Sequence, residues 1–549
     1  MVVIKMKKTI LQLLLFILAL VICCNFGVTA DENPDYWPTK TWRTASPESQ
    51  GMDSNLLENM LDKIWINDLD IDSVSVVRNG YLVLDAYTYG NHSDRNHRIA
   101  SCTKSIMSAL IGIAIDKGYI KDVNQPVLDF FPKHVAKNLD AEKKAMTLKH
   151  LLTMTTGLEC RDSYLYKWSG IKQMRMSADW VQYMIDLPMV EAPGARFEYC
   201  NGASFLLSAI LQEQTGMNAL KFAEKHLFDP LGISDVTWPS NLQGITVGYG
   251  RIHMRPQDMA KFGYLYLNDG LWEGEQIISS QWVNVSTRKH IGATLLPGYG
   301  YQWWIANPEI YAAIGSQGQF IMVVSGKNVV AVFTSHLARE DIYTPMVLLA
   351  SYIIPAVKSP EPLPGNPEGE NALKSAIALW QNTHPMDRRK MITEAEKVSP
   401  RLKLETYVNN EYGFSVTYDA ELLSMDSQLV SPLVFRRIGL RGVPSFAVLV
   451  DDIPKGMTLE NTGKYMIDLY KMLLPMADTK IKKQMLIKLS DGTKANYFEI
   501  NWRYQSLGML TVGVFAYKNN KIIGVGAASV EETPIEYLAG MATSLRFKK

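Results

Sequence analysis

Two groups of β-rich segments stand at the ends of one long stretch of this sequence, with helical patterns between them. The first group is the pair of runs 74–77 and 81–87, joined by Asn79-Gly80, a dipeptide typical of a type I′ hairpin turn. The second group lies within residues 299–335. If these strands belong to one sheet, the early and late strands must be neighbours in it. The pattern therefore predicts an α+β domain with an inserted helical region.

The composition is that of an ordinary globular protein. The 549 residues are 47% apolar and 20% charged, which allows large buried cores. The length suggests roughly two to four domains. Lysine and arginine number 56 against 55 aspartates and glutamates, so the net charge is close to zero. Neither nucleic acid nor an anionic membrane surface is expected as a partner.

A proline-rich stretch divides the chain. Four prolines and two glycines fall within residues 358–370, which is typical of a stiff linker. We expect a main domain at 31–357 and a linker with a helical segment at 358–403. Residues 404–549 are predicted to form a smaller α+β accessory domain, with helices at 459–473 and 534–545 beside several strands.

The first 30 residues differ from the rest. Three lysines precede an apolar run from residue 10 to about residue 28, and small residues follow at Val28-Thr-Ala30. This pattern predicts a secretory signal peptide at 1–30 and an exported protein. The alternative is an uncleaved segment that tethers the chain to a membrane. Lipidation at Cys23 or Cys24 is less favoured, because bulky Val21 and Ile22 precede them.

Three cysteines remain once the signal peptide is removed. Export permits a disulfide, and we predict that Cys160 pairs with Cys200, because both lie beside candidate site loops. Cys102 begins a buried helix and is expected to stay free. The alternative is three reduced, buried cysteines.

Ser101-Cys-Thr-Lys104 opens an apolar helix at 105–117 and is the first candidate catalytic motif. Lys104 lies one helical turn from Ser101 on the same face, where a partly desolvated amine can take the hydroxyl proton. The helix N-terminus favours an oxyanion. The chain also has Ser-x-x-Lys at Ser169 and Ser286, in sequence that indicates solvated surface.

Tyr199-Cys-Asn201 is the second candidate motif. Tyr-x-Asn occurs five times in the chain, but Tyr199 stands in a turn before an apolar helix, as Ser101 does. A tyrosine beside a lysine ammonium can act as a general base. Asn201 is a candidate to orient the lysine or to bind a substrate carbonyl. The alternative is an aromatic plug followed by a turn asparagine.

The third candidate is the glycine-rich segment Gly315-Ser-Gln-Gly318. Glycine in a β-strand lets a backbone N–H approach a ligand closely, which would complete an oxyanion hole at Gly315 and Ser316 beside Gln317. The alternative is a β-bulge.

In this order the three motifs resemble those of the serine β-lactamase and penicillin-binding-protein superfamily. The Tyr-x-Asn motif is similar to that of the branch with class C β-lactamases, D-alanyl-D-alanine carboxypeptidases, carboxylesterases and 6-aminohexanoate-dimer hydrolase. Further similar phrases lie at 150–158, 227–233 and 298–304, and the resemblance covers about residues 36–357. It implies a β-lactamase/transpeptidase-like fold, with an antiparallel sheet flanked by helices and a helical region.

The resemblance also implies roles for the site residues. Ser101 would attack the substrate to form an acyl-enzyme, and Lys104 and Tyr199 would transfer protons. The backbone N–H groups of Ser101 and Ser316 would hold the oxyanion. No cofactor is implied. No metal site is predicted either, because the nine histidines show no ligand spacing.

The third motif departs from the family pattern. β-Lactamases and transpeptidases carry Lys-Thr-Gly or His-Thr-Gly there, whereas this chain has Ala313-Ile-Gly315 or, in a shifted register, Ser316-Gln-Gly318. Losing a hydrogen bond to a charged substrate group costs about 1.5–3 kcal/mol. We therefore expect a small ester or amide substrate without a carboxylate anchor. The alternatives are a β-lactamase or D-alanyl-D-alanine carboxypeptidase, and a non-catalytic cell-envelope binding or sensor module.

Overall fold

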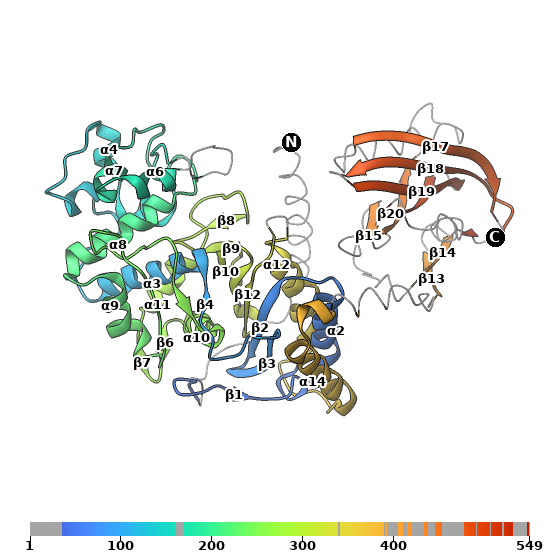
Figure 1. Cartoon of the computed structure of the whole chain (residues 1–549), viewed down its shortest axis with the longest axis horizontal. Helices are drawn as coiled ribbons and strands as arrows, with labels where there is room; N and C mark the ends of the chain where they lie inside the picture. The colour runs from blue at the N-terminus through green and yellow to red at the C-terminus, as the bar shows by residue number, and fades with distance from the viewer. Residues whose placement is uncertain are drawn as a thin grey trace. The chain divides into compact units, whose positions relative to one another are not determined.

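The computed structural model describes two compact units, which divide between Arg388 and Arg389 (Figure 1). In the first unit it describes residues 34, 36–160, 162, 170–338 and 341–388. In the second it describes residue 391 and the segments 404–409, 414–419, 433–436, 445–452, 477–489, 491–504, 507–518, 521–530 and 546–547. The predicted signal peptide at 1–30 lies outside the described residues.

An eight-stranded sheet forms the centre of the first unit. Its strand order is β1 (Arg43–Thr44), β3 (Tyr81–Tyr87), β2 (Ile71–Arg78), β12 (Val329–Ser335), β11 (Gln319–Val324), β10 (Ile310–Gly315), β9 (Trp304–Asn307) and β8 (Gly298–Tyr299). All neighbours are antiparallel except β1 and β3, so the sheet is mixed. Pairing of β2 with β12 confirms that early and late strands are neighbours.

The β2–β3 hairpin turns at Asn79 and Gly80. Their φ angles are 51° and 79°, so both residues adopt the left-handed conformation that a type I′ turn requires. The Asn-Gly prediction is confirmed at this position.

Helices cover both faces of the sheet. Strands β2, β10, β11 and β12 are buried along their whole length, which requires packing on each side. Helix α10 (Pro256–Leu267) packs on β2, β11 and β12, and a Cβ on its Gly263 would lie 2.6 Å from Val330 Cγ1. Figure 1 shows α2, α12 and α14 on the other side. Their bounds, with the neighbouring segments, are α2 (Ser54–Ile66), α12 (Thr344–Leu348), η6 (Leu349–Ile353), α13 (Ile354–Ala356) and α14 (Pro367–Asn382).

The inserted region is mainly helical. Its two central helices, α3 (Thr103–Asp116) and α8 (Asn201–Thr215), pack against each other. Its other elements are β4 (His97–Arg98), η2 (Ala100–Cys102), η3 (Val127–Phe130), α4 (Ala141–Ala145), α5 (Leu148–Leu152), α6 (Gly170–Met176), α7 (Trp180–Asp186), α9 (Ala219–Ala223), η4 (Glu224–Phe228), β5 (His253–Met254), β6 (Leu271–Trp272), β7 (Glu275–Gln276) and α11 (Ser280–Thr287). Outside this region, η1 (Glu48–Gln50) precedes α2 and η5 (Ser325–Lys327) joins β11 to β12.

The proline-rich segment after residue 357 belongs to the first unit. Lys358 N–H donates to Gly51 O at 2.9 Å, and Leu363 N–H donates to Glu48 O at 2.8 Å. Helix α14 then packs on α2 and buries Trp380. These contacts hold the segment against the main domain, and the first compact unit extends to residue 388. The predicted stiff linker and helical segment thus begin with residues that pack against the main domain.

The second unit contains two antiparallel sheets. One has the order β13 (Leu404–Asn409), β14 (Phe414–Asp419), β21 (Arg546–Phe547), and the other β15 (Leu433–Arg436), β16 (Ser445–Asp452), β20 (Lys521–Val530), β19 (Leu507–Lys518), β18 (Lys494–Tyr504), β17 (Ala477–Lys488). The helices predicted at 459–473 and 534–545 lie outside the described residues. Within the described parts of the chain, no helix is both long and apolar enough to span a bilayer.

Candidate active site

Ser101 lies in a tight turn between β4 and α3. The turn is the 3₁₀ segment η2, and its first residue, Ala100, has a φ of 47°. Ile99 N–H donates to Ile252 O at 3.0 Å, and Thr103 Oγ1 donates to Ala100 O at 2.7 Å. These bonds fix a left-handed alanine that would otherwise be strained. The turn therefore holds Ser101 in one position at the start of the helix.

Lys104 is buried beside Ser101, and its amine has three polar neighbours. Nζ lies 3.1 Å from Ser101 Oγ, 2.8 Å from Asn201 Oδ1 and 2.7 Å from Tyr249 O. The side-chain oxygen of Asn201 and the carbonyl oxygen of Tyr249 can only accept hydrogen bonds, whereas the Ser101 hydroxyl can also donate one. A neutral amine has two N–H groups, so it can satisfy both acceptors and direct its lone pair toward the serine O–H.

Burial favours that neutral amine. Lys104 is 2% exposed, and desolvation lowers its pKa to about 7 even though the negative charge of Asp162 opposes the shift. Near neutral pH, a large fraction of the protein therefore carries Lys104 as a base.

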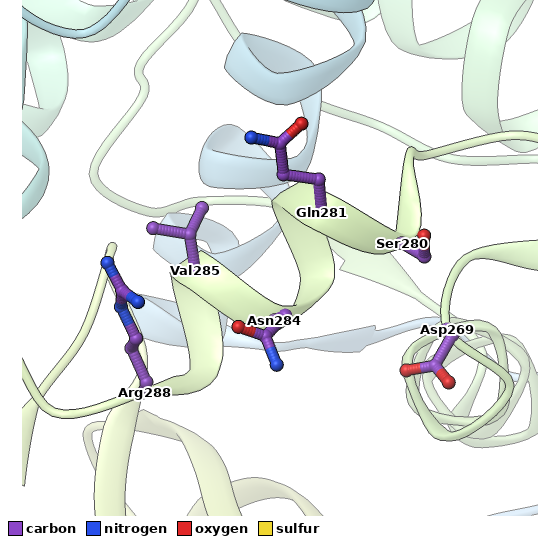
Figure 2. Close-up of a pocket in the computed structure, with 6 residues that line it drawn as sticks. All are labelled: Asp269, Ser280, Gln281, Asn284, Val285 and Arg288. Carbon is purple, nitrogen blue, oxygen red and sulfur yellow. The ribbon is translucent and has the colours of Figure 1, made fainter.

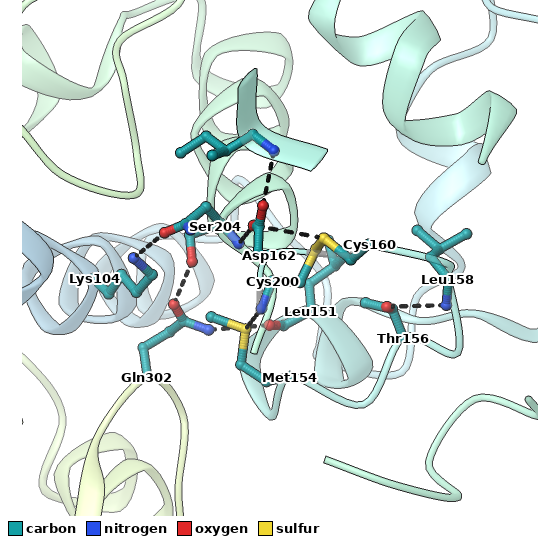
Figure 3. Close-up of a disulfide and its surroundings, with 12 residues drawn as sticks. Lys104, Leu151, Met154, Thr156, Leu158, Cys160, Asp162, Cys200, Ser204 and Gln302 are labelled. Carbon is teal, nitrogen blue, oxygen red and sulfur yellow. Dashed lines mark hydrogen bonds between the residues drawn. A yellow bond between two sulfur atoms is a disulfide. The ribbon is translucent and has the colours of Figure 1, made fainter. Parts of the chain in front are cut away.

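Asp162 joins the second motif to the neighbouring helical region (Figure 3). Its carboxylate accepts hydrogen bonds from the N–H groups of Asn201 and Ile171, each at 2.7 Å. Burial raises the pKa of Asp162, and these N–H groups oppose the rise. The bond to Asn201 anchors the first residue of α8, whose side chain contacts Lys104. No local sequence pattern marks Asp162, which lies in an aperiodic stretch.

A disulfide joins Cys160 to Cys200, the pair selected from the sequence. Cys200 stands between Tyr199 and Asn201, so the bridge ties the second motif directly to the segment that precedes Asp162. Cys102 is buried and free, as expected from its place at the start of α3.

Tyr199 lies against both Lys104 and the edge of the sheet. Lys104 Nζ is 4.9 Å from the centre of the Tyr199 ring, and that ring stacks on Trp304 of β9 at a centroid distance of 6.1 Å. Phe197 also packs against Trp304. These three rings form an aromatic wall beside the serine and lysine.

The last residue of β10, Gly315, lies against the serine turn. A Cβ on Gly315 would stand 2.5 Å from Ile99 O and 3.1 Å from Ala100 Cβ. A Cβ on Gly318 would instead meet Ser335 and Leu337, away from that turn. The geometry favours the register in which Ala313-Ile-Gly315 is the third motif.

The turn after Gly315 is exposed. Ser316 and Gln317 are both exposed, and Gln317 adopts a φ of 65°. Gln317 O accepts hydrogen bonds from Leu337 N–H at 3.1 Å and from Ser335 Oγ at 2.8 Å. The side chains of Ser316 and Gln317 are therefore at the surface, while the backbone of this turn is fixed to the end of β12.

Gln302 is a buried side chain that links several helices around the site, and no role was predicted for it from the sequence. Its side-chain amide donates to the carbonyls of Leu151 and Leu152, both at 3.0 Å, and its oxygen accepts from Ser204 at 2.6 Å. Its own carbonyl accepts from Ser105 at 2.8 Å. One residue thus links α3, α5 and α8 around the site.

An open surface cavity lies elsewhere in the first unit (Figure 2). It has a volume of about 440 Å³ and shares no residue with the group around Ser101. Its lining is mostly polar and consists of Asp269, Ser280, Gln281, Asn284, Val285 and Arg288. It brings no nucleophile together with a buried base, so the chemistry belongs to the Ser101 site.

A serine beside a buried lysine on this fold defines the class of protein as a serine hydrolase. The family model described as Beta-lactamase matches residues 68–344. The chain belongs to the beta-lactamase family. The matched segment runs from before β2 to the start of α12, so it contains every strand of the central sheet except β1, and it includes all three sequence motifs.

Two curated relatives and one solved structure show the range of similar proteins. The 6-aminohexanoate-dimer hydrolase of Paenarthrobacter ureafaciens is 23% identical over 272 residues, which cover 45% of this chain and 68% of that protein. The D-alanyl-D-alanine-carboxypeptidase/endopeptidase AmpH of Escherichia coli is 24% identical over 200 residues, or 32% of this chain and 50% of that protein. A family VIII carboxylesterase structure is 15% identical, with a TM-score of 0.44 over 57% of this chain and 98% of its own.

Proposed function

We propose that the protein is an exported serine hydrolase that cleaves an ester or amide through an acyl-enzyme on Ser101. Lys104 takes the serine proton as the hydroxyl attacks the substrate carbonyl. Tyr199 passes a proton to the leaving group, and Asn201 keeps the amine of Lys104 in place. The backbone N–H groups of Ser101 and Ser316 stabilise the oxyanion.

The environment of Lys104 carries this proposal. The amine has two acceptors, Asn201 Oδ1 and Tyr249 O, and one hydroxyl, that of Ser101, within 2.7–3.1 Å. Burial keeps a large part of the population neutral near pH 7. A neutral amine held in this way is a general base within reach of the nucleophile before any substrate binds.

The third motif supports a substrate without a carboxylate on the β10 side of the site. Ala313 is fully buried in β10, where related β-lactamases have a lysine or histidine. The aromatic wall of Phe197, Tyr199 and Trp304 suits an apolar acyl or leaving group. Simple esters and small amides have these properties, whereas penicillins carry a carboxylate.

Cleavage of penicillin-like or cell-wall substrates is the second candidate. The charges of Arg175 and Arg251 oppose the rise that burial causes in the pKa of Tyr249, whose carbonyl binds Lys104. These arginines therefore place positive charge near the site from the helical region. A substrate carboxylate could bind there in place of the missing cation on β10.

Two features of the chain support export: the pattern of its first 30 residues and a disulfide beside the site. The first 30 residues have the charge and apolar pattern of a signal peptide. Cys160 and Cys200 form a disulfide beside the site, and structural disulfides persist mainly in oxidising compartments outside the cytosol.

Covalent labelling tests the proposed nucleophile. A fluorophosphonate probe is expected to modify the purified protein once, on the peptide that contains Ser101, because among the described residues this serine lies 3.1 Å from a buried lysine amine whose pKa is lowered to about 7. The prediction of solvated surface at Ser286 is wrong, because Ser286 is fully buried in α11 and donates to Val283 O. Ser286→Ala, which alters this second Ser-x-x-Lys sequence, should label as wild type does. An intact protein that stays unlabelled beside a reactive control esterase would contradict the assignment.

A comparison of substrates separates the two candidate functions. Faster turnover of nitrocefin than of p-nitrophenyl butyrate would select the second candidate.

The pH dependence of hydrolysis tests the role of Lys104. Because only the neutral amine acts as a base and its pKa is about 7, kcat/KM should rise with pH below about 7 and level off above it. Asp162 opposes the lowering of that pKa, so Asp162→Asn should move the acid limb to lower pH. A profile that is flat from acid to alkaline pH, or a limb centred at the ordinary lysine value, would exclude Lys104 as the base.

A further inference from the structure

Two histidines and an aspartate meet at one end of the central sheet. Asp72 Oδ2 lies 2.8 Å from His97 Nε2 and 2.7 Å from His336 Nδ1, and the three ligand atoms are all within 4.8 Å of one another. The residues come from β2, from β4 and from the position directly after β12. No metal site was predicted from the sequence, and these three positions are far apart in the chain.

We propose that Asp72, His97 and His336 bind a divalent first-row transition metal such as Zn²⁺, with water completing the coordination. Two imidazoles and one carboxylate are a frequent ligand set for such an ion when one position stays open. Metal bonds of about 2.0–2.1 Å in a tetrahedron separate the ligand atoms by about 3.3 Å. To accept the ion, Asp72 Oδ2 and each of the two histidine nitrogens need to move apart by only about half an ångström. The ion would replace the protons that Asp72 now shares with His97 and His336.

The surroundings of these side chains match those of metal ligands. A ligating histidine usually donates its second ring N–H to a carbonyl, and His97 Nδ1 lies 3.3 Å from Arg98 O. Asn91 Nδ2 donates to Asp72 Oδ1 at 3.2 Å and so holds the carboxylate in position. Each of these two ligands thus has a hydrogen bond that fixes its orientation.

The site is also accessible and electronegative. The His336 side chain is 58% exposed, whereas those of Asp72 and His97 are each 12% exposed, so an ion can enter past His336. A second acidic residue, Asp70, precedes Asp72 by two positions in the chain. Asp70 O also accepts a hydrogen bond from His336 N–H at 2.8 Å.

The proposed metal site is connected to the third motif. The residues on either side of His336 hold the β10–β11 turn: Ser335 Oγ donates to Gly318 O at 2.6 Å, and Leu337 N–H donates to Gln317 O at 3.1 Å. A metal ion on His336 would restrain this segment against β2. The ion therefore has a structural role at the rim of the hydrolase site and takes no part in the reaction of Ser101.

Metal titration of the full chain tests the proposal. After treatment with a chelator and its removal, the protein should bind one equivalent of Zn²⁺ by calorimetry, and Co²⁺ should give the visible absorption of a low-coordinate site. His336→Gln, His97→Gln and Asp72→Asn should each weaken Zn²⁺ binding by about tenfold or more. His92→Gln, an exposed histidine of the same region, is the matched control and should bind as wild type does.

Hydrogen exchange provides a second, independent measurement. Zn²⁺ should slow exchange of the Leu337 amide in the wild type and leave it unchanged in His336→Gln, a surface variant that is not expected to impair folding. Absence of stoichiometric Zn²⁺ binding to the wild type would overturn the proposal. Equal binding by wild type and His336→Gln would also overturn it, since the three side chains would then form only a hydrogen-bonded brace.

Discussion

Replacing Ser101 with alanine is expected to lower kcat/KM for an activated ester by about 10⁴-fold or more, and Lys104→Met should lower it by about 10³–10⁴-fold. Ser101→Ala removes the proposed nucleophile. Lys104→Met removes the base, because no other amine is described within reach of Ser101 Oγ. The two residues act as one unit, so the double variant should be no slower than Ser101→Ala alone.

The Lys104→Met variant needs a check on folding. Methionine fills a similar volume and removes a buried amine, but it leaves Asn201 Oδ1 and Tyr249 O without their donor. That loss costs about 1–3 kcal/mol of stability, which chemical denaturation can measure. Ester hydrolysis by Lys104→Met within tenfold of wild type would show that another group activates the serine. Additive losses in the double variant would show that the two residues act independently.

The sequence predicted the parts of the site that lie on short local patterns. The spacing of Ser101 and Lys104 places both on one face of a helix start, and the structure brings them within 3.1 Å. Tyr199 and Asn201 flank the start of the next apolar helix, and both contact Lys104. The pairing of β2 with β12 followed from strands at both ends of the domain.

The remaining site residues depend on contacts that no local pattern encodes. Tyr249 contributes a backbone carbonyl to Lys104, so its side-chain identity gives no signal. Asp162 lies in an aperiodic segment, and only the disulfide beside it marked that region. Gln302 was included in a similar phrase at 298–304, but its role depends on the meeting of three helices.

Composition alone could not show that the segment after residue 357 packs against the main domain. Prolines and glycines between 358 and 370 indicated a linker, because composition reports chain stiffness and not what the chain packs against. The backbone bonds to Glu48 and Gly51, together with buried Trp380, depend on the surface of α2 and the turn before it. To predict such packing, one must know both the segment and the surface on which it lies.

Substituting alanine for Gly315 is expected to lower kcat for ester hydrolysis by about 10²-fold, the cost of moving a catalytic group by about 1 Å. The added Cβ would stand 2.5 Å from Ile99 O and 2.9 Å from Gln319 Cβ, so β10 and the serine turn must separate. That separation moves the Ser316 N–H away from the oxyanion position, and loss of one such donor alone costs about 10²–10³-fold.

Gly292→Ala is the matched control for Gly315→Ala, because no atom lies within 4 Å of a Cβ at Gly292 and its φ is not positive. Its kcat should equal that of wild type. Overpacking at Gly315 should also cost about 1–3 kcal/mol of stability, so kcat is compared at a temperature where denaturation shows both variants to be folded. Fluorophosphonate labelling is a single irreversible reaction that the oxyanion donors only accelerate, whereas ester turnover depends on those donors in every cycle. Gly315→Ala should therefore label more slowly but to completion, and wild-type kcat in this variant would remove β10 from the oxyanion hole.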